Sequence, residues 1–107
     1  MKYQVLFGAK AKQDVLDLFD FIASQDSPEK ALKFLSRVDQ WCRSFGTFPE
    51  RGLLRNDVRP GLRVAGFRRR VSIGFEIAGD RVVILRLLYG GRNVTTIDFQ
   101  TDTDPEE

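Results

Sequence analysis

Hydrophobic side chains recur with two different periods along this chain, and the changes of period divide it into helices and strands. Residues Lys2–Phe7 (KYQVLF) are rich in strand-forming side chains and are followed by Gly8, which indicates a first strand. From Lys10 onward, apolar residues recur at steps of three and four, as on one face of an amphipathic helix. These residues are Ala11, Val15, Leu18, Phe19 and Ile22.

A second helix is predicted after the break at Ser24–Pro28. Ser27 is placed to cap it, Pro28 to be its first helical residue and Glu29 to put a negative charge in its first turn. Gly46 is its expected C-cap, with Pro49 just beyond. So short a break between two helices predicts an antiparallel hairpin. The apolar stripe of this helix is Ala31, Phe34, Leu35, Val38, Trp41, Cys42 and Phe45.

The second half of the chain has the alternating period of strands, after an expected loop over residues 46–61. Leu62–Phe67 alternates, and residues 70–77 place four apolar side chains on one face. Gly79-Asp80 predicts a hairpin turn. Arg81–Tyr89 is almost continuously apolar, which is typical of a central strand covered on both faces. The four apolar residues are Val71, Ile73, Phe75 and Ile77.

This order, β-α-α-β-β-β, predicts an α+β fold in which the helical hairpin packs on an antiparallel sheet formed by a β-meander. Residues 1–99 are expected to form the single domain, with Val94–Phe99 as an edge strand or a short final turn. The acidic tail, residues 100–107, is expected to be disordered.

Charge is distributed unevenly between the two halves. Residues 51–101 hold ten arginines, no lysine and four acids, a net charge of +6 (10 − 4), whereas the whole chain carries only +2. The planar guanidinium group binds carboxylate or phosphate in a bidentate manner and keeps its charge when partly buried. The basic half is therefore expected to meet an anionic partner, either nucleic acid or the acidic surface of a protein.

Composition narrows the possible chemistry. A chain of 107 residues with 42% hydrophobic content predicts one globular domain. It has one cysteine, Cys42, and no histidine, which argues against an internal disulfide, a zinc site or an imidazole base. We expect neither a metal nor a cofactor. The N-terminus resembles neither a signal peptide nor a membrane span, so the cytoplasm is the expected compartment.

Several short motifs occur in a fixed order and spacing: Ser27-Pro28 with Ala31 and Phe34, Pro49 with Gly52, Pro60-Gly61-Leu62-Arg63, and Ile84–Asn93. Together they resemble the ParE/RelE superfamily of toxins from bacterial type II toxin–antitoxin modules. The resemblance covers about residues 1–95 and is closer to the ParE branch.

The resemblance implies a toxin neutralised by a cognate antitoxin, whose acidic, amphipathic segment wraps it in a hetero-oligomer. ParE-like toxins act on DNA gyrase without cleaving a substrate, whereas RelE-like toxins cut messenger RNA on the ribosome. The expected function is therefore growth inhibition by binding DNA gyrase, and the alternative is a RelE-like messenger RNA endoribonuclease.

Proton-transfer groups are scarce near the basic strands. Cleavage of RNA needs groups that take up and release a proton. Only Tyr89, Glu76 and Asp80 could titrate there, and the lysines of RelE-like enzymes are missing. Tyr89 is the catalytic candidate if the protein is a nuclease, but the chain as a whole favours an inhibitor that acts by binding.

The candidate residues for binding the target or the antitoxin come from the basic strands. Arg86 interrupts an apolar strand on the predicted face of Val82 and Ile84, so it either forms a buried ion pair, with Glu76 as a possible partner, or faces a ligand. Arg92 follows two glycines, which allow the backbone to approach a ligand closely. The candidates are Arg63, Arg68, Arg70, Arg86, Tyr89 and Arg92.

Other polar residues are assigned to the fold. Arg68–Arg70 should alternate sides of a strand, with Arg69 at a solvated strand end. The acids Asp14, Asp17 and Asp20 are expected on a solvated helix face. Trp41 and Cys42 lie on the apolar stripe of the second helix and are expected in the core.

Overall fold

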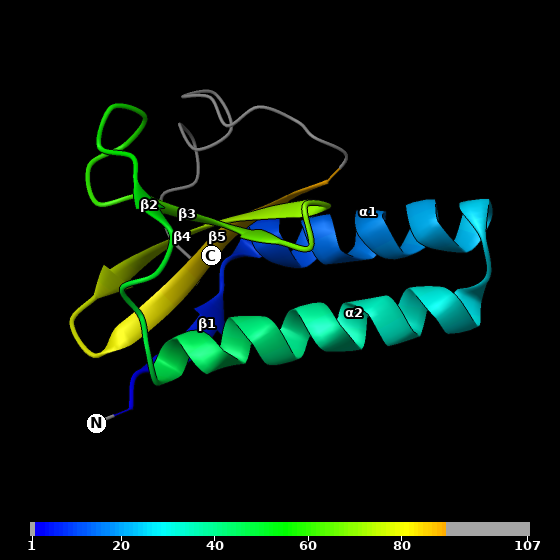
Figure 1. Cartoon of the computed structure of the whole chain (residues 1–107), viewed down its shortest axis with the longest axis horizontal. Coiled ribbons are helices and arrows are strands. Elements are labelled where there is room, and N and C mark those ends of the chain that lie inside the picture. Colours follow the sequence, from blue (N-terminus) through cyan, green and yellow to red (C-terminus); the bar gives the residue numbers. More distant parts are fainter. Residues whose placement is uncertain (1, 90–107) are drawn as a thin grey trace.

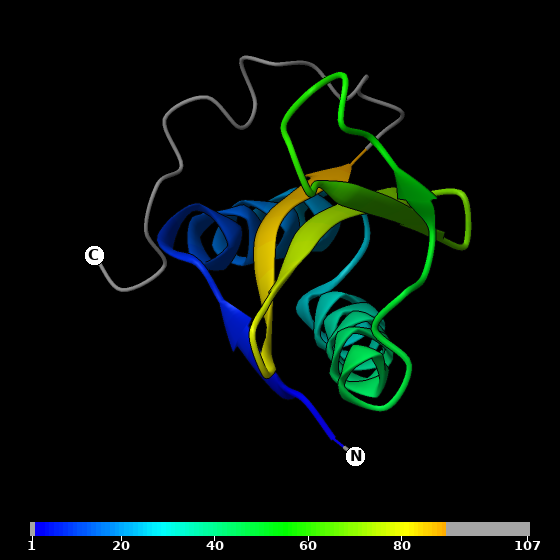
Figure 2. The same cartoon turned by 90° about the vertical axis from the view of Figure 1, so that its left-hand side faces the viewer.

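The computed structural model describes residues 2–89, which form a five-stranded sheet with two helices on one face (Figure 1). Helices α1 (Ala9–Gln25) and α2 (Pro28–Arg43) run antiparallel to each other, as the sequence predicted. Figure 2 looks along both helices and shows them lying beside the sheet. The predicted structure of residues 94–107 lies outside the described residues.

The meander is antiparallel, but the sheet as a whole is mixed. Its strands, in the order β1-β5-β4-β3-β2, are β1 (Gln4–Phe7), β5 (Arg81–Tyr89), β4 (Val71–Ala78), β3 (Arg63–Phe67) and β2 (Leu53–Leu54). β1 pairs with β5 in parallel, so the expectation of a wholly antiparallel sheet is wrong at this edge. The long connection through the helices and the meander allows either direction, and the alternation of side chains does not encode it.

The start of α2 has the predicted chemistry, whereas its end differs. The Ser27 hydroxyl accepts a hydrogen bond from the Lys30 N–H (3.2 Å), with Pro28 as the first helical residue. The helix ends at Arg43 and continues as one 3₁₀ turn, Ser44–Gly46. Gly46 has no positive φ; its carbonyl accepts from the Tyr3 N–H (2.7 Å), and a Cβ there would lie 2.7 Å from the Tyr3 carbonyl oxygen. This glycine therefore permits close contact with the chain entering β1.

Buried side chains cover both faces of β5, as its sequence predicted. On the helix side, Val82, Ile84 and Leu87 join the main core with the stripes of both helices and the alternating apolar residues of β4. On the other face, Val83 and Leu85 pack with Leu62, beneath the loop that precedes β3. Cys42 is fully buried and Trp41 is partly buried against the main core, which confirms their assignment to packing.

The predicted loop contains a short strand. β2 pairs with only Arg63 and Val64 of β3. Gly52, just before it, has φ +70°, and a Cβ there would lie 2.2 Å from the Val64 carbonyl oxygen. Only glycine can adopt this backbone conformation and also lie so close to the Val64 carbonyl oxygen. Within the described part of the chain, no helix is long and apolar enough to cross a membrane.

Candidate functional site

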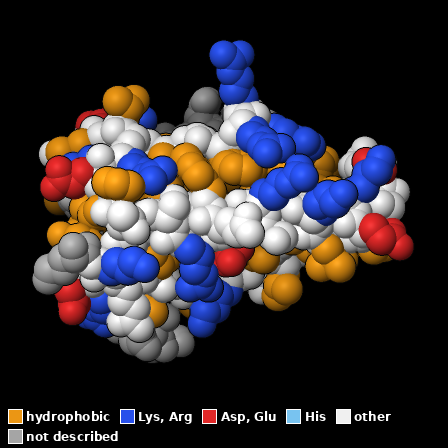
Figure 3. All heavy atoms as spheres, turned by 60° about the horizontal axis from the view of Figure 1, so that its bottom comes forward, with side chains coloured by type: hydrophobic (Ala, Val, Ile, Leu, Met, Phe, Trp, Pro, Cys, Tyr) orange, Lys and Arg blue, Asp and Glu red, His pale blue; other side chains and the backbone are white. Residues whose placement is uncertain are grey.

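A basic pocket lies between α2 and the turn that joins β3 to β4. It is a hollow of about 310 Å³ that combines five basic side chains with one carboxylate, a net charge of +4. In Figure 3, which views the molecule from the side of α2, Lys and Arg side chains gather at one end of the surface. The charged lining residues are Lys30, Lys33 and Arg37 of α2, Arg68 and Arg70 of the turn, and Asp26.

The turn at the pocket has an unusual backbone for its sequence. Arg68 and Arg69 both have positive φ, 52° and 58°, and the Arg70 N–H donates to the Phe67 carbonyl oxygen (2.9 Å). Positive φ at both central residues of a β-turn is the type I′ geometry, which asparagine and glycine normally occupy. The expectation that Arg68–Arg70 alternate sides along a strand is therefore wrong, because the chain turns within these residues.

Arg70 connects the pocket to Tyr89. Its Nη2 donates to the Tyr89 hydroxyl (2.9 Å), and its guanidinium lies 5.0 Å from the Phe34 ring centroid and 5.8 Å from that of Tyr89. The Tyr89 ring also packs on Phe21, with centroids 5.1 Å apart. Three of the predicted site residues, Arg68, Arg70 and Tyr89, are thus brought together, and cation–π contacts help to orient Arg70.

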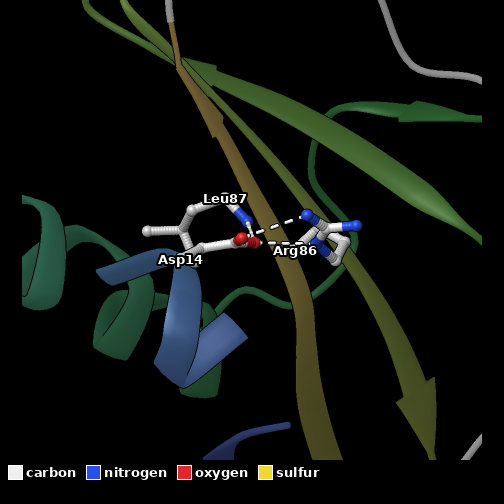
Figure 4. A network of polar contacts seen from close by, with 3 residues as sticks. All are labelled: Asp14, Arg86 and Leu87. Carbon is white, nitrogen blue, oxygen red and sulfur yellow. Dashed lines mark hydrogen bonds and ion pairs between the residues drawn. The ribbon is translucent and has the colours of Figure 1, made fainter. Parts of the chain in front are cut away.

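Arg86 forms a buried ion pair, but its partner is Asp14 of α1 rather than Glu76 (Figure 4). Its Nε and Nη2 donate to the two carboxylate oxygens of Asp14, at 2.8 and 3.0 Å. The Leu87 N–H donates to the same carboxylate (2.8 Å). Asp14 is only 9% exposed, so its expected place on a solvated helix face was wrong.

A β-bulge in β5 moves Arg86 off the face that strict alternation predicts. Gly74 pairs with Arg86 but Phe75 pairs with Ile84, so Leu85 is an extra residue in β5. Beyond the bulge, Leu87 takes the helix-facing position that strict alternation would give to Arg86. β1 pairs no further along β5 than Ile84, and the Asp14 carboxylate accepts the Leu87 N–H beyond that point. Arg86 and Asp14 therefore fix α1 against the sheet.

Glu76 has a different partner, Arg59 of the loop before β3. Their nearest charged atoms are 3.5 Å apart, and both side chains are about three-quarters buried. In the same loop, Arg55 forms a bidentate pair with Asp57 (2.9 and 2.8 Å). These contacts hold the loop over the apolar cluster of Leu62, Val83 and Leu85.

Arg63 lies away from the basic pocket, near an apolar groove of about 590 Å³. Its Nη1 donates to the Arg51 carbonyl oxygen (3.4 Å), and Arg63 pairs with Leu54 across the sheet. Phe48 and Leu53, which line the groove, are 66% and 71% exposed. Such a concentration of exposed apolar side chains is typical of an interaction surface. The remaining lining residues are Trp41, Arg51, Gly52, Val64, Ala65 and Gly66.

The described residues offer little reactive chemistry elsewhere. Burial raises the pKa of the Cys42 thiol to about 12, and the negative charge of Asp39 contributes in the same direction, so Cys42 is a packing residue rather than a nucleophile. Among residues 2–89, no three His, Cys, Asp or Glu side chains form a group that could hold a metal ion. Arg92 lies outside the described residues, and its role stays a prediction.

Sequence reasoning missed the part of the pocket that α2 contributes. Lys30, Lys33 and Arg37 recur at steps of three and four on one helix face. The first half of the chain is neutral in sum, which hid this local concentration. The spacing of these residues on one helix face was the available signal. Only the fold shows that the β3–β4 turn, with Arg68 and Arg70, lies across the pocket from them.

The α+β fold, with a helical hairpin on a mixed sheet, and the basic pocket agree with the expected resemblance to ParE-like toxins. The family model for the ParE toxin of type II toxin–antitoxin systems (parDE) matches residues 5–94 of the sequence, and the chain belongs to this family. It is 30% identical, over 81 residues, to Toxin ParE3 of Caulobacter vibrioides; the match covers 76% of this chain and 80% of that protein. The protein is thus the toxin component of a type II toxin–antitoxin system.

A solved structure has the same fold. It is titled as a chromosomal ParDE toxin–antitoxin system from P. aeruginosa, and one of its chains superposes with a TM-score of 0.73 at 25% identity. The match covers 82% of this chain and 96% of that one. Family membership implies a cognate antitoxin as partner.

Proposed function

We propose that this toxin inhibits growth by binding DNA gyrase in the cytoplasm, without cleaving a substrate itself. The match of residues 5–94 to the ParE toxin is the observation that carries the proposal. The chemistry of the surface supports it. Arginine and lysine side chains are abundant in the pocket, whereas its one acidic residue, Asp26, already pairs with Lys30 (3.3 Å). Such a surface suits capture of an anionic partner better than proton transfer.

One contact favours an alternative, the messenger RNA endoribonuclease. The Tyr89 hydroxyl accepts from Arg70, which lines the basic pocket. A phenol beside a phosphate-binding site could act as a general acid or base. The nuclease would therefore need the Tyr89 hydroxyl group, whereas gyrase inhibition would not.

Tyr89→Phe is expected to leave gyrase inhibition unchanged, because the ring keeps its packing on Phe21 and only the hydroxyl is lost. Arg92→Ala is expected to abolish inhibition, because we propose that Arg92 binds the target. Gyrase supercoiling and ribosome-dependent cleavage of a messenger RNA, measured on the same preparations, separate the two functions. Cleavage that disappears in Tyr89→Phe, with supercoiling unaffected by the wild-type toxin, would refute the gyrase proposal.

We further propose that the cognate antitoxin covers the apolar groove. Within the described residues, β2 pairs with Arg63 and Val64 only, so the outer edge of β3 lacks a strand partner over residues 65–67. An amphipathic segment could place apolar side chains against Phe48 and Leu53 and carboxylates near Arg51 and Arg63.

Leu53→Glu is therefore expected to weaken antitoxin binding by at least tenfold, because it places a carboxylate in the apolar contact. Leu53 is 71% exposed in the toxin alone, so the fold should tolerate the change. Leu32→Glu is the matched control, since Leu32 is 62% exposed on α2 and does not line the groove. Copurification and calorimetry of the coexpressed pair measure the effect. Equal affinities of the two variants would place the antitoxin elsewhere.

A further inference from the structure

We propose that the basic pocket between α2 and the β3–β4 turn binds a backbone phosphate of nucleic acid. Lys30, Lys33 and Arg37 present ammonium and guanidinium groups from one face of α2, and Arg68 and Arg70 approach from the turn. The hollow of about 310 Å³ can hold a phosphate group with part of its sugar. A helix and a turn thus supply cations from two sides, an arrangement that suits contact with a phosphate.

The strained backbone of the turn is evidence for a ligand-binding role. Residues other than glycine at positive φ cost about 1–3 kcal/mol each, and such strain gathers at functional sites. Asparagine or glycine would form this turn at lower cost. Arg68 and Arg69 occupy it instead, and Arg68 lines the pocket. The fold therefore tolerates strain at the position that brings a guanidinium to the pocket.

The lining favours a phosphate over an acidic peptide. An amphipathic peptide needs apolar surface for its affinity. Among residues 2–89, the apolar lining consists of Ile22, which is buried, and Phe34, whose ring lies beneath the Arg70 guanidinium. The apolar groove offers a peptide far more, with Phe48 and Leu53 exposed. A phosphate needs cations and little else, and the pocket supplies five against one carboxylate.

Phosphate binding by the pocket does not depend on the identity of the toxin's target. Duplex DNA, as in a complex with gyrase, and messenger RNA share the phosphate chemistry. Binding by the purified toxin alone, in the absence of gyrase and ribosomes, therefore tests the pocket separately from the proposed function.

The experiment measures fluorescence anisotropy of a labelled DNA duplex and of a labelled single-stranded RNA over a range of salt concentrations. Arg68→Asn is expected to weaken binding several-fold and to reduce the salt slope by about one. Its melting temperature should not fall, because asparagine adopts positive φ readily. Arg69→Asn is the matched control: Arg69 has the same backbone conformation but does not line the pocket, so binding should be retained.

A second pair of variants tests the helix side. Lys33→Gln combined with Arg37→Gln should weaken binding further, whereas Lys12→Gln on α1 should not. A preference for DNA or for RNA identifies the source of the phosphate, and either result supports the pocket. Equal losses in Arg68→Asn and Arg69→Asn, binding of polyglutamate as tight as that of nucleic acid, or no binding of either nucleic acid would overturn the proposal.

Discussion

Replacement of Asp14 by alanine is expected to lower the free energy of unfolding by about 3 kcal/mol, although alanine is the better helix former. The Asp14 carboxylate accepts from Arg86 and from the Leu87 N–H, and the Asp14 and Arg86 side chains are 10% and 14% exposed. Its loss leaves a buried guanidinium without this carboxylate and a buried N–H without its acceptor. Urea denaturation followed by circular dichroism measures the change.

Asp17→Ala is the control on the same helix. Asp17 is exposed and accepts a surface hydrogen bond from Gln13 (3.0 Å), so its replacement should change stability by less than about 0.5 kcal/mol. The double variant Asp14→Leu with Arg86→Met should recover much of the lost stability, because apolar pairs often replace buried ion pairs without cost. Equal effects of Asp14→Ala and Asp17→Ala would show that the pair does not anchor α1.

The helices and the meander could be predicted because local chemistry specifies them. The Ser27 cap, Pro28 and the apolar stripe of α2 are all signals within one helix, and the structure uses each of them. In the same way, alternation along β4 correctly placed its apolar residues against the helices. These features depend on neighbours in sequence, which is the information that periodicity contains.

The polar partners could not be predicted because they depend on tertiary geometry. The extra residue Leu85 displaces Arg86 from the face that alternation assigns to it, and its partner Asp14 is 72 residues away. The positive-φ turn within Arg68–Arg70 was not predicted, because asparagine and glycine, the usual signals of such a turn, are absent from this segment. The basic pocket is formed by two segments that are distant in sequence, α2 and the β3–β4 turn, and only the fold brings them together.

Gly52→Ala is expected to destabilise the protein by about 3 kcal/mol. Two costs add at this position, since alanine is strained at φ +70° and its Cβ would lie 2.2 Å from the Val64 carbonyl oxygen. The clash is with backbone of β3, so no rotamer change can relieve it, and the chain must move β2 away from its partner strand.

Gly61→Ala separates the two costs. Gly61 has φ +82°, but a Cβ there meets no atom within 4 Å, so it should cost only the backbone strain, about 1 kcal/mol. Denaturation of both variants gives the difference, which measures the clash. Because Gly52 and Leu53 line the apolar groove, Gly52→Ala should also weaken antitoxin binding, whereas Gly61→Ala should not. Equal losses of stability would mean that β2 can shift freely, and the groove would then be too mobile to define the proposed antitoxin site.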